Sequence, residues 1–234
     1  MQYIQTPAII LQKIPINDFK FIIKLFSEKK GLISASVEIN NIIQPALFQP
    51  PNISNIQIIQ NKNHKYSIKD IAPVYIYKEL YLDFKKNTIA QFITEILIKS
   101  IKEELTDEKL FQLSKQTFIN IDKNVYQNIN FVHLDFIKNY LLVSGHYPIN
   151  NYDTYNQYFN SSEGRFVHTQ TNSTLSKDDS LLIHQFFFTD NENTLSIPVL
   201  HLTHILLNYL QLHLSIPSIQ SLTMLKEALL EFEL

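Results

Sequence analysis

Cysteine is absent from the 234 residues of this chain. The protein can therefore form neither disulfides nor thiolate metal sites, and it has no thiol nucleophile. Its three glycines leave no room for a glycine-rich loop that would cradle a phosphate. No apolar run approaches the roughly 18 residues that a membrane-spanning helix needs, and the N-terminus lacks the features of a signal peptide. We expect a soluble, cytoplasmic protein without membrane contact.

The sequence has a single arginine, Arg165. Lysine must supply the cationic chemistry, and bidentate reading of base edges by arginine is nearly excluded. The formal net charge is −2, but its distribution is uneven. Up to Tyr75, eight lysines stand against four acidic residues, so this part carries +4 and the remainder −6. A basic N-terminal part on an acidic body predicts that any anionic partner binds near the N-terminus.

The N-terminal part is rich in aromatic and β-branched residues that alternate with polar ones. This pattern predicts five strands, at about residues 3–15, 19–26, 32–39, 53–60 and 66–75. With no helix large enough to cover them, five short strands favour closure into a small barrel of the OB type. An open antiparallel sheet packed on a helical body is the alternative.

From Asp83 onward the apolar period changes to three or four residues, which predicts six helices. Asp83 and Ser176 are expected to cap two of them. The most apolar helix lies within residues 128–148 and should end at Gly145, since glycine adopts the left-handed conformation and Pro148 prevents resumption. The predicted fold is α+β, with an OB-type β-barrel over residues 1–78 followed by an all-helical domain over 79–234. An irregular insert that can include one short hairpin is expected at about 149–175.

Candidate catalytic and metal-binding patterns are weak. His201 and His204 lie three residues apart on one predicted helix, but no third ligand has matching spacing, so structural histidines are favoured. The pairs Glu103–Glu104 and Asp178–Asp179 lie at predicted helix ends, where solvated or dipole-paired carboxylates are expected. We predict a protein that is not an enzyme and that needs neither a metal nor another cofactor.

The remaining candidate site is a group of aromatic residues and lysines in the N-terminal part. OB barrels bind single strands with a positive groove and aromatic stacking platforms. Phe19, Phe21, Tyr66 and Tyr75 are candidate platforms, but strand alternation makes barrel core the favoured interpretation for them. The predicted nucleic-acid-binding residues are Lys20, Lys24, Lys29, Lys30, Lys62, Lys65 and Lys69.

Motifs spread along the chain resemble one bacterial family. The run from His133 to Pro148, His-Leu-x-Phe-Ile-x-x-x-Leu-x-x-x-Gly-x-Tyr-Pro, is similar to the middle of the recombination mediator family RecO, in the branch without zinc-binding cysteines. Further matches follow the family's order. They are Phe26-Ser-x-x-x-Gly31-Leu-Ile-Ser34, Gln44-Pro-Ala-Leu-Phe-Gln-Pro50, Ile89-Ala-x-Phe-x-x-Glu95-Ile-Leu, Tyr209-x-x-x-His213 and Ser221-Leu-x-x-Leu-Lys226-Glu.

The resemblance implies a mediator of DNA repair and homologous recombination. Such a protein binds single- and double-stranded DNA, promotes annealing, and acts with RecR to load RecA on strands coated by single-stranded DNA-binding protein. The alternative is a protein-interaction adaptor of the repair machinery with weak or lost direct DNA binding. This chain departs from the family after the third strand, where a basic loop is usual, because residues 38–44 contain no cation.

The resemblance also implies that the helical body docks the acidic, aromatic-ended tail of single-stranded DNA-binding protein. Such docking needs an apolar pocket with a cation. Lys138 is the cation inside the apolar helix, and His133 is a candidate second donor. The alternatives are that Lys138 forms the solvated edge of a buried helix and that His133 is a core residue.

Overall fold

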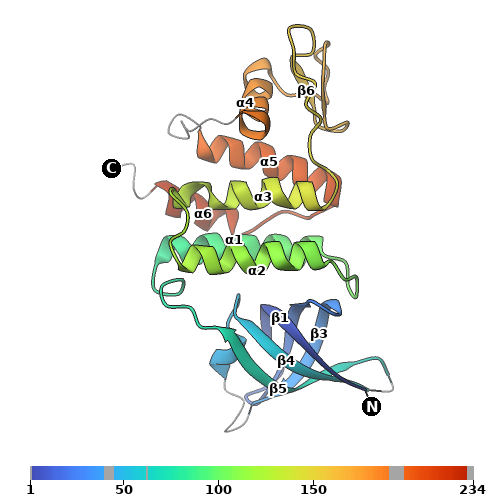
Figure 1. Ribbon diagram of the computed structural model, residues 1–234, viewed down its shortest axis with the longest axis vertical. Helices are drawn as coiled ribbons and strands as arrows, with labels where there is room; N and C mark the ends of the chain where they lie inside the picture. Colours follow the sequence, from blue (N-terminus) through green and yellow to red (C-terminus); the bar gives the residue numbers. More distant parts are fainter. Residues whose placement is uncertain (1, 40–44, 62, 190–197, 231–234) are drawn as a thin grey trace. The chain divides into compact units, whose positions relative to one another are not determined.

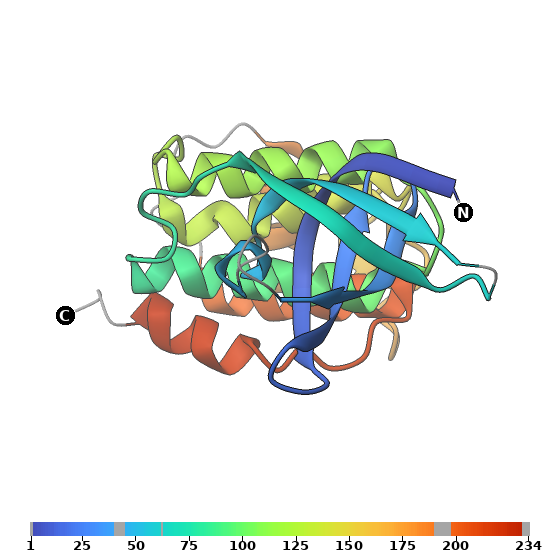
Figure 2. The same ribbon diagram turned by 90° about the horizontal axis from the view of Figure 1, so that it is seen from below.

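The computed structural model describes residues 2–39, 45–61, 63–189 and 198–230. Its N-terminal part is a closed barrel with the strand order β1-β2-β3-β5-β4 (Figures 1 and 2). The strands are β1 (Gln2–Pro15), β2 (Lys20–Ser27), β3 (Gly31–Glu38), β4 (Ile53–Gln60) and β5 (Tyr66–Tyr75). The predicted α+β class and its OB-like N-terminal part are confirmed, and the open sheet is not observed.

The length of β1 allows the barrel to close. Its first half pairs with β4, from Gln2↔Gln60 to Ile9↔Ile53, and its second half pairs with β2. A register shift after Ile10 bends the strand between these two partners. The remaining seam is a short parallel pairing of β3 with β5 at Ala35↔Tyr66 and Ser36↔Ser67.

Alternation along the strands fills the barrel interior with aliphatic side chains. Ile23, Leu25, Ile33 and Ala35 are buried in one cluster with residues of β1, β4 and β5. Phe48, in the short 3-10 helix η1 (Pro45–Phe48), is fully buried in the same cluster. The neighbouring residues of β2 and β3 therefore face outward, which decides where their polar side chains lie.

The helices follow the predicted periodicity. Asp83 caps the first helix, since its Oδ1 accepts from the backbone N–H of Lys86 at 2.9 Å, and Ser176 caps the fourth in the same way through Asp179. The six helices in the described ranges are α1 (Phe84–Ser100), α2 (Glu108–Asp122), α3 (Val132–Val143), α4 (Lys177–Phe188), α5 (Val199–Leu214) and α6 (Leu222–Leu230).

The most apolar predicted helix is α3. It begins at Val132, directly after the 3-10 turn η2 (Ile129–Phe131). It ends as predicted, with Gly145 in the left-handed region at φ +77°. The hairpin expected in the irregular insert is present as β6 (Tyr158–Asn160) and β7 (Arg165–Val167).

The chain divides into two compact units. One contains Met1–Ile129 together with Ile219–Leu234, and the other contains Asn130–Ser218. The barrel and α1, α2 and α6 thus belong to one unit, whereas α3, α4, α5 and the hairpin belong to the other. The predicted domain boundary at residues 78–79 lies in the linker between β5 and α1 and stays a prediction.

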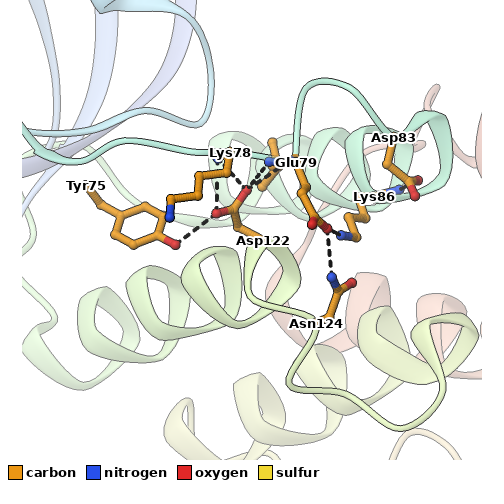
Figure 3. A network of polar contacts seen from close by, with 8 residues as sticks. Tyr75, Lys78, Glu79, Asp83, Lys86, Asp122 and Asn124 are labelled. Carbon is orange, nitrogen blue, oxygen red and sulfur yellow. Dashed lines mark hydrogen bonds and ion pairs between the residues drawn. The ribbon is translucent and has the colours of Figure 1, made fainter.

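A buried carboxylate at the end of α2 holds that linker (Figure 3). Asp122 is 4% exposed, and its oxygens accept hydrogen bonds from the backbone N–H groups of Lys78, Glu79 and Leu80 and from the Tyr75 hydroxyl at 2.8–3.2 Å. Burial alone would raise the pKa of this carboxyl, but the hydrogen bonds outweigh burial and lower it. The carboxylate is therefore the form that fixes the linker.

The loop between α1 and α2 touches the outside of the barrel at β3. The backbone N–H of Glu104 donates to the Leu32 carbonyl at 2.9 Å. Gly31 has φ +67°, and a Cβ at this position would lie 2.1 Å from the Leu105 carbonyl oxygen. Only glycine permits this approach, which brings Glu103 and Glu104 against the barrel surface.

Helix α6 returns to α1 through Glu95. The Glu95 carboxylate accepts from the backbone N–H groups of Gln220 and Ser221 and from the Ser221 hydroxyl, and it forms an ion pair with Lys99 at 2.5 Å. Burial opposes ionisation, yet these donors lower the pKa of Glu95 to about 2. The last helix is thereby capped by a side chain of the first.

Candidate nucleic-acid interface

The outward side chains of β2, β3 and β5 form a continuous polar surface on the barrel, which we call the lysine face. Strand pairing sets Lys20 opposite Glu38, and Lys24 opposite Ser34. Across the parallel seam, the Ser36 hydroxyl lies 3.0 Å from that of Ser67. The face thus consists of Lys20, Ile22, Lys24, Ser34, Ser36, Glu38, Ser67 and Lys69, and the β4–β5 turn adds His64 and Lys65.

Two hollows mark this surface, and Ser36 lines both. The first has a volume of about 280 Å³ and lies between Lys20 and Lys69. The second, of about 370 Å³, lies beside the β4–β5 turn and the α1–α2 loop. Its polar lining residues include Ser34, His64, Lys65, Glu103 and Glu104.

Four of the predicted lysines therefore share one face. Lys20 and Lys24 lie on β2, Lys69 lies on β5, and Lys65 lies in the turn before β5. Two others lie elsewhere, in the turn between β2 and β3, where the Lys29 ammonium donates to the Gln5 carbonyl at 2.9 Å and Lys30 is the next residue. Lys62 lies outside the described residues, as do residues 40–44 of the segment that lacks the family's basic loop.

Carboxylates moderate the charge of the lysine face. The Lys20 ammonium lies 3.8 Å from Glu38, but both side chains are exposed, so this pair adds little stability. Glu103 and Glu104 were predicted as solvated helix ends. They lie in the α1–α2 loop and line the larger hollow. Burial and the nearby Glu104 carboxylate raise the pKa of Tyr66, whose hydroxyl accepts from the Gln60 amide at 3.2 Å.

Of the four candidate stacking residues, three have structural partners. Tyr66 belongs to the barrel core, Phe21 packs against it with the Lys13 ammonium 4.5 Å from its ring centre, and Tyr75 binds Asp122. For Tyr66 and Phe21 this outcome agrees with the barrel-core interpretation favoured from strand alternation, whereas Tyr75 contacts the linker carboxylate. Phe19 differs, because its side chain is 70% exposed in the turn between β1 and β2.

The two predicted partner-binding residues lie on α3 in the second unit. The Lys138 ammonium donates to the Phe186 carbonyl at 2.8 Å and lies 5.2 Å from the centre of the Phe186 ring. His133 is fully buried, and its Nε2 lies 2.7 Å from the Thr203 hydroxyl oxygen. His133 thus occupies a core position and offers no accessible nitrogen to a partner.

The motif residues also make structural contacts. Glu95 and Ser221, from two separate motifs, bind each other, as Gly31 and the α1–α2 loop do. The Tyr209 hydroxyl donates to the His146 carbonyl at 3.0 Å, which joins a second pair of motifs within the second unit. The motifs that carry the resemblance therefore hold the architecture together, whereas the lysine face lies outside most of them.

In the described part of the chain, no group of three or more histidine and acidic side chains is arranged to hold a metal ion. His201 instead lies 2.6 Å from Asp179, the second residue of one predicted acidic pair. Within the same ranges, every helix is too short or too polar to cross a bilayer.

Comparison with known proteins defines the class of this molecule. Residues 81–154 match the family model described as the C-terminal part of recombination protein O. The chain is 32% identical over 239 residues to the DNA repair protein RecO of Flavobacterium psychrophilum, and the match covers 96% of this chain and 98% of that protein. The RecO of Flavobacterium johnsoniae is 28% identical with the same coverage, and that of Bacteroides fragilis is 26% identical over 95% of this chain and 98% of the relative.

These matches place the molecule, in which an OB-like barrel is followed by helices, among DNA repair proteins. The chain belongs to the RecO family. The resemblance identified from the motifs is confirmed, and a role in DNA repair and recombination follows from it.

The burial of His133 generates a prediction for stability. The Thr203 hydroxyl donates to the Val199 carbonyl at 2.7 Å, so it must accept from a protonated Nε2 of neutral His133. Burial lowers the pKa of His133 to about 3. Between pH 6.5 and 3 the unfolded chain therefore binds a proton that the folded chain does not, and stability is lost as pH falls through this window.

We expect protonation of His133 in the unfolded chain to lower the unfolding free energy by about 1.4 kcal/mol when the pH falls from 7.5 to 5.5. The measurement is urea unfolding of the parent and of His133→Gln at both pH values. Glutamine keeps a donor for Thr203 but does not titrate, so the variant should lose about 1.4 kcal/mol less than the parent. Equal losses in the two proteins would contradict the burial of a neutral imidazole.

Proposed function

We propose that this protein binds single- and double-stranded DNA through the lysine face of its barrel. The observation that carries the proposal is the convergence of Lys20, Lys24, Lys65 and Lys69 on one side of β2, β3 and β5. In OB folds the second and third strands, with the adjoining loops, form the surface that takes oligonucleotides. Lysines neutralise phosphates and release counterions without reading base edges, so binding has little sequence preference.

The wider role rests on family membership. As a RecO family member, the protein promotes annealing of complementary strands and acts with RecR to load RecA on strands coated by single-stranded DNA-binding protein. No catalytic step is needed, because annealing and loading require binding and positioning of strands. The lack of a catalytic sequence pattern supports a protein that is not an enzyme.

The alternative, a protein-interaction adaptor with weak or lost DNA binding, is favoured by the carboxylates of the lysine face. Glu38, Glu103 and Glu104 offset most of the charge of its four described lysines. The two functions differ in one observable property, because an adaptor has no salt-sensitive affinity for bare DNA.

Charge reversal on the lysine face tests the proposal. We expect the triple variant Lys24→Glu, Lys65→Glu and Lys69→Glu to bind unrelated single strands more weakly than the parent, to a similar extent for each. Loss of three phosphate contacts should reduce the slope of log Kobs against log salt by about 2, since each contact contributes about 0.7 on a single strand. Fluorescence anisotropy titrations over a range of salt concentrations measure both quantities.

A matched control separates this site from overall charge. The variant Lys109→Glu, Lys115→Glu and Lys177→Glu changes the net charge equally but lies on α2 and α4. It should keep the parent's salt slope. If both triple variants bind like the parent, the lysine face is not the site. If the parent itself does not bind at low salt, the DNA-binding proposal is contradicted and the adaptor function is favoured.

A second proposed contact lies on α3, where the Lys138 ammonium lies beside the largely buried rings of two phenylalanines of α4. This ammonium lies 5.2 Å from the Phe186 ring centre and 6.0 Å from that of Phe187. This cation suits the acidic tail of single-stranded DNA-binding protein, because the ammonium can pair with a tail carboxylate.

Reversal of this one charge should weaken tail binding by tenfold or more, since a charge-assisted contact becomes a repulsion (about 1.4 kcal/mol per tenfold). The measurement is a titration of labelled tail peptide against Lys138→Glu, with Lys115→Glu as the control of equal charge and circular dichroism as the test of folding. A folded Lys138→Glu protein with undiminished peptide affinity would remove this residue from the site.

A further inference from the structure

Phe19 is held in place although its ring is in solvent. Its backbone N–H donates to the Asn17 Oδ1 at 3.1 Å, and its carbonyl accepts from the backbone N–H of Ile39 at 2.7 Å. The same Asn17 oxygen accepts from the N–H of Lys20, which tightens the turn. The side chain is nevertheless 70% exposed. The turn therefore presents an ordered backbone that carries an aromatic ring with little contact to the protein.

The surroundings of the ring indicate what it contacts. Ile14, near the end of β1, and Ile16, in the turn, are also exposed, so apolar side chains lie near the ring, although the turn also carries the exposed Asn17 and Asp18. Lys20 flanks the turn on β2, and Lys13 flanks it on β1, where the Lys13 ammonium lies over the Phe21 ring and donates to the Pro45 carbonyl. Lys20 lines the smaller hollow of the lysine face. Exposed apolar side chains near lysines fit a ligand that has flat apolar faces on an anionic backbone.

Single scattered apolar residues on a surface are common and need no explanation. Phe19 differs because three features coincide at one turn, namely an ordered backbone, apolar neighbours and flanking lysines. An aromatic ring on a fixed backbone loses little conformational entropy on binding, since it has two side-chain torsions. This combination favours stacking on a base over a purely electrostatic contact.

We propose that Phe19 stacks on an unpaired base of single-stranded DNA while the neighbouring lysines bind its phosphates. This inference rests on the proposed function and deepens it. Every base has a π-face, so stacking tolerates any sequence. In a duplex those faces are already covered by neighbouring bases, so the ring contributes to single strands alone. Phe19 is then the residue that makes the barrel prefer single-stranded over double-stranded DNA.

The test compares single-stranded and duplex oligonucleotides of equal length, at one salt concentration, with the full chain. Phe19→Ala should weaken single-strand binding by roughly 5- to 150-fold, as expected for the loss of one aromatic–base stack. Its duplex affinity should change less than about twofold, and its salt slope should match the parent's because no phosphate contact is lost. Phe19→Trp should retain single-strand affinity, since a larger ring still stacks.

Tyr3→Ala provides the matched control, because Tyr3 is an aromatic residue of similar exposure on β1 in the part that pairs with β4. It should bind both DNA forms like the parent. The inference is overturned if folded Phe19→Ala binds single strands as the parent does, or if it loses single-strand and duplex affinity equally. In both cases the lysine variants still report on the proposed function. A parent without DNA affinity would overturn the proposed function and this inference together.

Discussion

One buried carboxylate accepts hydrogen bonds from four donors, and these bonds determine how the barrel is joined to the helices. Asp122 gathers three successive backbone N–H groups of the linker and the hydroxyl of the last residue of β5 (Figure 3). Glu79, on the same linker, pairs with the nearly buried Lys86 of α1 and accepts from Asn124. With the linker fixed at both ends, α1 starts in one direction, and the loop after it reaches β3 at Gly31. A buried charge of this kind specifies geometry as much as it adds stability, because its donors must all be in place at once.

That geometry shapes the electrostatics of the candidate interface. Glu103 and Glu104 are carried to the lysine face by the loop that Gly31 admits, and with Glu38 they offset much of the lysine charge. A face of nearly balanced charge holds DNA less tightly at physiological salt than a strongly basic groove. Such a surface is suited to strands that must be bound and passed on. On a face of nearly balanced charge, an exposed aromatic residue contributes a larger share of the affinity, because stacking does not weaken with salt as phosphate contacts do.

Local patterns in the sequence predicted much of the fold. Strand alternation, the caps Asp83 and Ser176 and the helix end at Gly145 depend on neighbouring residues, and the structure confirms them. Contacts between distant residues were missed, such as those of Asp122 with the linker. The candidate site was predicted in part. Lysine-rich strands could be recognised, but the separation of Lys29 from Lys69 depends on barrel closure, and the contact of Glu104 with the barrel depends on one glycine. The exposure of Phe19 could not be predicted, since alternation alone does not distinguish a ring at a turn from one in the core.

The central claim is that the barrel binds DNA on the side formed by β2, β3 and β5. Amide hydrogen exchange of the full chain, measured with and without a saturating single-stranded oligonucleotide, tests this claim most directly. Protection should increase in β2, β3, β5 and the β1–β2 and β4–β5 turns, and residues 130–218 should exchange as they do in the unbound protein. Protection limited to residues 130–218, with the barrel unchanged, would contradict the claim.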